Sequence, residues 1–276
     1  VSQIILPDRI TSIGANPFCL CDQLTSIIVS SEHPCIEIVD GVVFSKPDKR
    51  LVCYPVTLKG DTYSVPDGIQ GIDSTAFEGC QSLRRIILPE SIESIGDSSF
   101  HACSNLYDIN LPENLMSIGE LAFYQCSSLN KVVLPEGITY IKRLTFDDCS
   151  SLAEVILPSS LTNIGTYAFG NCSSLEQLDL PESLTTIGFA SFSSCTGLSK
   201  VSLPDGLTTI GKYAFSGCGN LTKIILPDSL ISIGEDAFAY CNLLTITVNR
   251  DSYAKQYCEE SGLNFTYPDS NSWLDD

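Results

Sequence analysis

Cysteine is the residue type with the most capacity for chemistry in this chain, which has 13 cysteines among 276 residues. Nine of them recur at one place in a repeated unit: Cys21, Cys80, Cys103, Cys126, Cys149, Cys172, Cys195, Cys218 and Cys241. If the units stack at the spacing of β-strands, adjacent cysteines have parallel Cα–Cβ vectors. Their Cβ atoms then lie about 5 Å apart, beyond the roughly 3.5–4.5 Å of a disulfide. We therefore expect buried free thiols that pack as small hydrophobic side chains.

The other four cysteines, Cys19, Cys35, Cys53 and Cys258, lie outside this column, and the sequence leaves their pairing open. A zinc site is recognised by paired ligands, such as Cys-x-x-Cys or closely spaced Cys and His. The sequence contains no such spacing. We therefore expect neither a metal nor a cofactor.

Histidine is the commonest general base of enzymes, and the chain has two histidines, His33 and His101. His33 begins an insertion, and His101 occupies a variable position between the repeated Phe100 and Cys103. We expect both to be solvated surface residues. A Ser-His-Asp or Cys-His arrangement could still assemble in space, but no glycine-rich phosphate loop or nucleophile elbow marks one. The sequence thus predicts that the protein is not an enzyme.

Carboxylates form a second column, because the residue after each repeated proline is acidic in all units but the one with Ser159. These residues are Asp8, Asp67, Glu90, Glu113, Glu136, Glu182, Asp205 and Asp228. Calcium binding needs several oxygen ligands at one point, whereas such a column offers one carboxylate per layer. We interpret them as solvated turn residues.

The overall charge excludes some classes of partner. A net charge of −18 and an isoelectric point near 4.3 disfavour nucleic acid, whose phosphates need a basic footprint. No apolar run approaches the roughly 20 residues that span a bilayer, and the first residues lack the pattern of a signal peptide. We expect a mature segment that does not insert into a membrane.

The elements that position these residues follow from an internal repeat. Proline recurs every 23 residues at Pro66, Pro89, Pro112, Pro135, Pro158, Pro181, Pro204 and Pro227. Phenylalanine follows each proline by eleven residues at Phe77, Phe100, Phe123, Phe146, Phe169, Phe192, Phe215 and Phe238. Pro7, Phe18 and Cys21 keep the same spacing, so a further unit lies at the N-terminus, separated from the others by 36 extra residues.

Within a unit, the Ile-x-Leu alternation before proline predicts a short half-buried strand. Gly96 and its equivalents support a tight turn, and Ala-Phe-x-x-Cys predicts one helical or 3₁₀ turn that returns the chain. One unit cannot bury its own apolar side chains, so the units must stack. We predict an α/β solenoid, a right-handed superhelix of 23-residue units with short strands and helical turns.

The order Leu-x-x-Ile-x-Leu-Pro, Ile-x-x-Ile-Gly, Ala-Phe-x-x-Cys resembles the BspA-like class of bacterial leucine-rich repeats, and it covers most of the chain. The resemblance implies the leucine-rich-repeat fold. It also implies a ligand-binding role at the surface of a bacterial cell or as a secreted protein.

We expect three parts of the chain. Residues 1–250 form the solenoid, with an insertion at 28–63 between the first and second units. Asp40-Gly41 and Lys46-Pro47-Asp48 predict two hairpin turns there, and hence a three-stranded meander. Residues 251–267 form a cap of one helix and one strand, and residues 268–276 a disordered tail.

Strand alternation also predicts a ligand-binding face. If the residues one and three before each proline are buried, those two and four before it point outward together. This face gathers isolated β-branched and basic residues on an acidic protein, a mixture that suits a binding surface. The candidate residues are Arg85, Ile87, Asn110, Lys131, Val133, Glu154, Ile156, Lys200 and Lys223.

Two interpretations of function remain open. The first is a monomeric recognition module whose face binds a host or bacterial protein, or a glycan. The second is a structural spacer that holds other domains away from a cell surface, in which case Ile and Val are present only because they suit a pleated strand.

Overall fold

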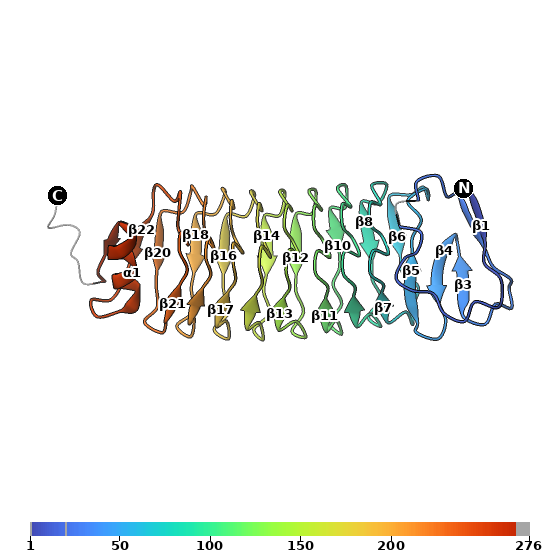
Figure 1. Ribbon diagram of the computed structural model, residues 1–276, viewed down its shortest axis with the longest axis horizontal. Coiled ribbons are helices and arrows are strands. Elements are labelled where there is room, and N and C mark those ends of the chain that lie inside the picture. Colours follow the sequence, from blue (N-terminus) through green and yellow to red (C-terminus); the bar gives the residue numbers. More distant parts are fainter. Residues whose placement is uncertain (1, 20, 269–276) are drawn as a thin grey trace.

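The computed structural model describes residues 2–19 and 21–268. The chain winds into an elongated stack of coils, with its first and last described residues at opposite ends (Figure 1). Each repeated coil has a strand before the proline, a second strand of two residues, and a return segment of turns. The predicted tail lies, from residue 269 onward, outside the described residues.

The first strands of the coils lie side by side along the stack. We call them the first row: β1 (Gln3–Ile5), β2 (Ser26–Ile28), β6 (Thr62–Ser64), β8 (Arg85–Ile87), β10 (Asp108–Ile109), β12 (Lys131–Val133), β14 (Glu154–Ile156), β16 (Gln177–Asp179), β18 (Lys200–Ser202), β20 (Lys223–Ile225), β22 (Thr245–Thr247) and β23 (Phe265–Thr266). Pairing is parallel, and partners such as Gln177 and Lys200 are 23 residues apart. The period of the sequence is therefore the period of the stack.

The two-residue strands after the prolines form the second row: β7 (Gly71–Ile72), β9 (Ser94–Ile95), β11 (Ser117–Ile118), β13 (Tyr140–Ile141), β15 (Asn163–Ile164), β17 (Thr186–Ile187), β19 (Thr209–Ile210) and β21 (Ser232–Ile233). They also pair in parallel at 23-residue intervals, as Thr186 does with Thr209. Each strand points its isoleucine inward, so this row closes a second side of the core.

The expected α/β class, with one helical or 3₁₀ turn in each return segment, is not confirmed. The described residues contain one α-helix, α1 (Tyr253–Ser261), and the return segments consist of turns. Two residues of a typical return segment, Ser98 (φ 53°) and Ala102 (φ 57°), are left-handed, which interrupts a helix. Alternate N–H groups of the segment bond across coils, as Phe100 N does to Ala122 O at 2.8 Å, while His101 N bonds within the turn to Ser98 O at 3.1 Å. The architecture is a β-solenoid, and the right-handed winding stays a prediction.

The eight repeated phenylalanines form one fully buried column, as the sequence predicted. Neighbouring rings stack with centroids 5.1 Å apart at Phe77 and Phe100, and 5.6 Å apart and nearly parallel at Phe169 and Phe192. The insertion continues the column, because Tyr54 stacks on Phe77 at 5.3 Å. Phe18, which has the repeat spacing, is only half-buried and packs in a separate N-terminal cluster.

The cysteine column lies against the phenylalanine column and is buried from Cys80 to Cys218. Its thiols also form hydrogen bonds, because each donates to the carbonyl of an aromatic residue in the preceding coil: Tyr54 for Cys80 and a phenylalanine for the others. Cys103 Sγ, for example, lies 3.1 Å from Phe77 O. The expectation for Cys21 was wrong, since its side chain is exposed. In that coil, Asn16 and Cys19 make the side-chain contacts to the next return segment, at Thr75 and Glu78.

Gly96 and its equivalents in the other coils are needed for a different purpose from the tight turn that we expected. Gly96 does not have a positive φ, so it is not required for a left-handed turn. A Cβ atom at Gly96 would lie 2.5 Å from Ser74 N, and one at Gly211 would lie 2.5 Å from Gly188 C. Glycine therefore lets successive backbones approach closely at the end of the second row.

The insertion forms an antiparallel meander of β3 (Ile36–Val39), β4 (Val42–Ser45) and β5 (Arg50–Cys53). β5 pairs in parallel with β7, so the meander extends the second row. His33, which we expected on the surface, is buried: its Nδ1 accepts from the N–H groups of Cys35 and Ile36 at 3.2 and 3.1 Å. This histidine fixes the start of β3.

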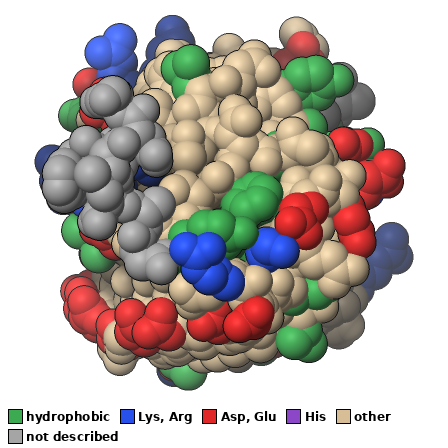
Figure 2. Space-filling view, turned by 90° about the vertical axis from the view of Figure 1, so that its left-hand side faces the viewer, with side chains coloured by type: hydrophobic (Ala, Val, Ile, Leu, Met, Phe, Trp, Pro, Cys, Tyr) green, Lys and Arg blue, Asp and Glu red, His purple; other side chains and the backbone are tan. Residues whose placement is uncertain are grey.

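The C-terminal end of the stack carries α1 and β23. Ser252 caps the helix by accepting from Lys255 N at 3.1 Å, and Gly262 ends it with a left-handed conformation. Buried Tyr257 meets Phe238 edge-on and ends the phenylalanine column. Seen end-on, a few apolar side chains lie near Lys or Arg, and acidic side chains follow the lower and right-hand rim (Figure 2). The helix thus covers the last apolar layer.

Replacing Phe169 by alanine should lower the free energy of unfolding by about 3–5 kcal/mol, because it empties a fully buried site between two stacked rings. Chemical denaturation measures this. The matched control is Tyr240→Ala, since Tyr240 is exposed and its loss should cost less than about 0.5 kcal/mol. A loss below about 1 kcal/mol for Phe169→Ala would show that the column is not core.

The thiols from Cys80 to Cys218 should not react with a thiol reagent in the folded protein and should all react after unfolding without reductant. Burial raises the pKa of Cys103 and Cys195 to about 12, which removes the reactive thiolate. Exposed Cys21 should react in the folded state. Mass spectrometry of labelled peptides separates the sites, and disulfides among the buried seven would contradict the stacked geometry.

Candidate ligand-binding face

The outward side chains of the first row stand where alternation predicts. In β8 and β12 the middle residues, Ile86 and Val132, are buried, while Ile87 and Val133 are 38% and 45% exposed. Ile156 of β14 is also 45% exposed. Three branched apolar side chains are therefore presented to solvent on one side of the stack.

Two of the four basic residues of this face are neutralised by carboxylates in the neighbouring coil. Arg85 Nε lies 2.9 Å from Asp108 Oδ2, and Lys131 Nζ lies 2.8 Å from Glu154 Oε1. All four side chains are about half exposed, so these pairs add little stability and mainly hold the side chains along the sheet. The column is less basic than its sequence indicates.

Lys200 and Lys223 are the two basic residues of this face that are not neutralised. They are register partners on β18 and β20, both are exposed, and neither makes an ion pair among the residues that the structure describes. Two like charges on directly opposite residues repel each other. This part of the face is a local positive spot that an acidic group could occupy.

The side-chain amide of Asn110 is hydrogen-bonded to the backbone of the neighbouring coil. Its Nδ2 donates to Leu88 O and its Oδ1 accepts from Leu88 N, both at 2.8 Å. The side chain thus supplies two bonds that a backbone neighbour would otherwise make. β10 has only two residues, and it is not hydrogen-bonded to β12 within the described chain. We therefore remove Asn110 from the residues available to a ligand.

A shallow hollow of about 410 Å³ lies on this face, between β14 and β16. These strands are not hydrogen-bonded to each other in the part of the chain that the structure describes. Glu154 and Ile156 line the hollow from β14, and Gln177 and Asp179 line it from β16. Sequence reasoning did not select Gln177 and Asp179, because Pro158 and Pro181 keep the regular spacing across the gap.

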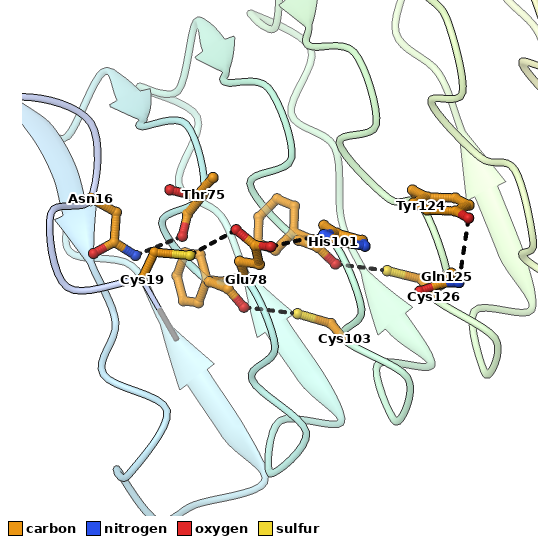
Figure 3. Close-up of polar contacts among 11 residues, drawn as sticks. Asn16, Cys19, Thr75, Glu78, His101, Cys103, Tyr124, Gln125 and Cys126 are labelled. Carbon is orange, nitrogen blue, oxygen red and sulfur yellow. Dashed lines mark hydrogen bonds and ion pairs between the residues drawn. The ribbon is translucent and has the colours of Figure 1, made fainter. Parts of the chain in front are cut away.

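A polar row crosses the return segments near the N-terminal end and includes the second histidine (Figure 3). His101 Nδ1 lies 2.9 Å from Glu78 Oε1, and its ring stacks on Tyr124 with centroids 5.2 Å apart. Cys19 Sγ donates to Glu78 Oε2 at 2.8 Å. His101 is therefore half-buried between Glu78 and Tyr124, not freely solvated as expected.

This row does not have the chemistry of a nucleophile. A reactive cysteine needs a cation beside it to favour the thiolate. Cys19 faces a carboxylate instead, and burial together with Glu78 raises the pKa of Cys19 to about 12. Within the described residues, no group of three or more His, Cys, Asp or Glu side chains could hold a metal ion. None of the described helices is long and apolar enough to span a membrane.

The geometry defines a class of protein: a β-solenoid of leucine-rich 23-residue coils with one exposed strand face. Comparison with protein-family models matches the BspA type leucine rich repeat region, in 6 copies, over residues 1–46, 56–176 and 139–258. The chain belongs to this family. A comparison with curated proteins gave no match.

Solved structures of leucine-rich repeat proteins are similar. One from Eubacterium ventriosum has a TM-score of 0.64 at 25% identity, covering 87% of this chain and 58% of its own. One from Bacteroides ovatus has a TM-score of 0.54 at 29% identity, covering 78% and 51%. The T. pallidum leucine rich repeat protein has a TM-score of 0.52 at 27% identity, covering 86% and 97%. The chain thus spans little more than half the length of the first two. Together these likenesses indicate a repeat-based interaction module.

Asp147, in the same return-segment position as His101 and Tyr124, should make stability depend on pH. Its carboxyl is buried and accepts from Asn171 Nδ2 at 3.2 Å. Burial, and then the charge of Asp148, raise its pKa from 3.8 to about 6. The folded protein then retains a proton that the unfolded chain has already lost, so the stability present below pH 3.8 is lost as the pH rises through about 6.

The measurement is the free energy of unfolding at several pH values for the wild type and for Asp147→Asn. The wild type should lose about 1–3 kcal/mol more than the variant between pH 4 and pH 7. Taking the difference cancels the repulsion among the other carboxylates. Parallel curves for the two proteins would contradict this account of Asp147.

Proposed function

We propose that this protein is a non-enzymatic, monomeric recognition module that acts outside a bacterial cell, secreted or at its surface, and binds a partner protein through the first row. The observation that carries the proposal is the exposed line of Ile87, Val133 and Ile156, which ends beside the hollow between β14 and β16. The family and the leucine-rich repeat relatives support it.

The composition of this face suits a protein partner. Isolated apolar side chains surrounded by charged and amide groups are typical of non-obligate interfaces. The ion pairs of Arg85 and Lys131 keep long side chains along the sheet, so the apolar ones stand clear of them. A partner can thus cover the branched side chains without first displacing a disordered layer of lysines, which lowers the entropy cost of binding.

The hollow would supply specificity. Glu154, Asp179 and Gln177 offer oxygen acceptors around it, and Ile156 offers an apolar wall. Asp179 already accepts from Ser202 Oγ at 3.2 Å, which holds its carboxylate in place. A basic side chain of a partner, with an apolar stem and a donor head, would match this combination. The chain's net charge of −18 would also attract a basic partner surface.

The test is a variant in which Ile87, Val133 and Ile156 are all changed to serine. A partner is first isolated by affinity capture and identified by mass spectrometry, and its affinity is then measured by surface plasmon resonance. We expect the variant to fold normally and to bind at least tenfold more weakly, a loss of about 1.4 kcal/mol.

The matched control changes Met116, Ile231 and Leu243 to serine, because these apolar side chains are also exposed but lie outside the first row. Its affinity should equal that of the wild type. Equal affinity of the first-row variant would place the binding site elsewhere. If affinity capture with the wild-type protein isolates no partner, the recognition proposal fails and the spacer interpretation is favoured.

A further inference from the structure

A second hollow, of about 330 Å³, lies on the second row, on a different side of each coil from the proposed protein-binding face. Tyr140 of β13, Asn163 of β15 and Thr186 of β17 line it in successive coils. Gly165, Thr166 and Gly188 follow the ends of β15 and β17 and complete the wall. The strands therefore hold an aromatic ring, an amide and hydroxyl groups around one depression.

The depression is built into the packing of the coils. Gly165 and Gly188 cannot carry side chains, because a Cβ atom there would lie 2.8 Å from Ile141 O and 2.7 Å from Ile164 O. The side chains beside the ring are small, since Asn163 and Thr186 are register partners next to Tyr140. The Tyr140 side chain is 47% exposed, and the residues beside its ring are too small to cover it.

The polar side chains around this hollow have no hydrogen-bond partners among the described residues. The hydroxyls of Tyr140, Thr166 and Thr186 and the amide of Asn163 make no hydrogen bond within the described chain. The adjacent threonine column differs, because Thr162 donates to Thr139 O at 3.0 Å and Thr185 to Thr162 O at 3.2 Å. The column with Thr162 and Thr185 therefore links the coils by hydrogen bonds. The column with Tyr140, Asn163 and Thr186 leaves its donors and acceptors available to a ligand.

The lining has no charged side chain, although the chain as a whole has a net charge of −18. A ligand held there gains nothing from charge and must pair with an amide, hydroxyls and a π face. Sugar rings have this chemistry, because their C–H groups suit the negative face of an aromatic ring and their hydroxyls both donate and accept. We propose that this hollow, which we call the Tyr140 site, binds a neutral saccharide.

The size and openness of the site agree with a short stretch of glycan. A volume of about 330 Å³ is at the lower end of the range for ligand sites, which suits a mono- or disaccharide unit of a longer chain. An open site with one aromatic contact should bind weakly, with a Kd on the order of 1 mM for a free oligosaccharide. Repeated units along a glycan would strengthen binding through several copies of the protein.

The experiment titrates the ¹⁵N-labelled full chain with maltotriose, cellotriose, mannotriose and N-acetylchitotriose, up to about 10 mM each, by NMR. At least one should give saturable shifts at residues 140, 163–166 and 186–188. Tyr140→Ala should weaken that binding at least tenfold, whereas Tyr140→Phe, which keeps the ring, should lose less. Tyr107→Ala is the matched control, because Tyr107 is 46% exposed but does not line this hollow.

Trigalacturonic acid serves as the anionic probe and should not bind. The inference is overturned if none of the four neutral sugars gives saturable shifts, if Tyr140→Ala binds as the wild type does, or if only the anionic sugar binds. Thermal unfolding of each variant confirms that the fold is retained. Because the site lies outside the first row, its failure would leave the proposed protein-binding function untouched.

Discussion

Stacking between successive coils is the constraint on which the rest of this structure depends. A 23-residue coil is too thin to enclose a core, so each buried side chain is covered by its counterpart one coil away. The phenylalanine rings, 5.1 Å apart at Phe77 and Phe100, show this arrangement at its simplest. The thiols from Cys103 to Cys218 stabilise the same contact, because each donates to a phenylalanine carbonyl of the preceding coil, such as Phe77 O. Glycine at positions such as Gly96 allows the backbones to come close enough for both.

The same repetition makes the surface a set of straight columns. A side chain that points outward meets its neighbour at strand spacing, so opposite charges placed one coil apart pair along the column, as Lys131 does with Glu154. Hydroxyls placed one coil apart fasten the backbone, as Thr162 does to Thr139. Part of the polar surface is therefore engaged in holding the stack together.

The candidate sites lie where this regularity is interrupted. β14 and β16 do not pair within the described chain, and a hollow opens between them on the first row. Asn110 replaces two backbone bonds at another break. On the second row, Tyr140 takes a place that other coils give to Gly, Ser, Thr or Asn, and its ring stands beside small residues. A regular solenoid offers a uniform surface, so function is expected at these local departures.

The sequence by itself determined the period, the buried phenylalanine column and the alternation of the first row, because all three depend on spacing and residue type within one unit. It also located the meander, since Asp40-Gly41 and Lys46-Pro47-Asp48 are local turn signals. Only the tertiary structure decided that His33 is buried, that Cys21 is exposed and that Arg85 and Lys131 are neutralised, because each depends on which coil lies alongside. The gap beside Gln177 could likewise not be predicted, since two strands can lack hydrogen bonds to each other while their prolines stay 23 residues apart.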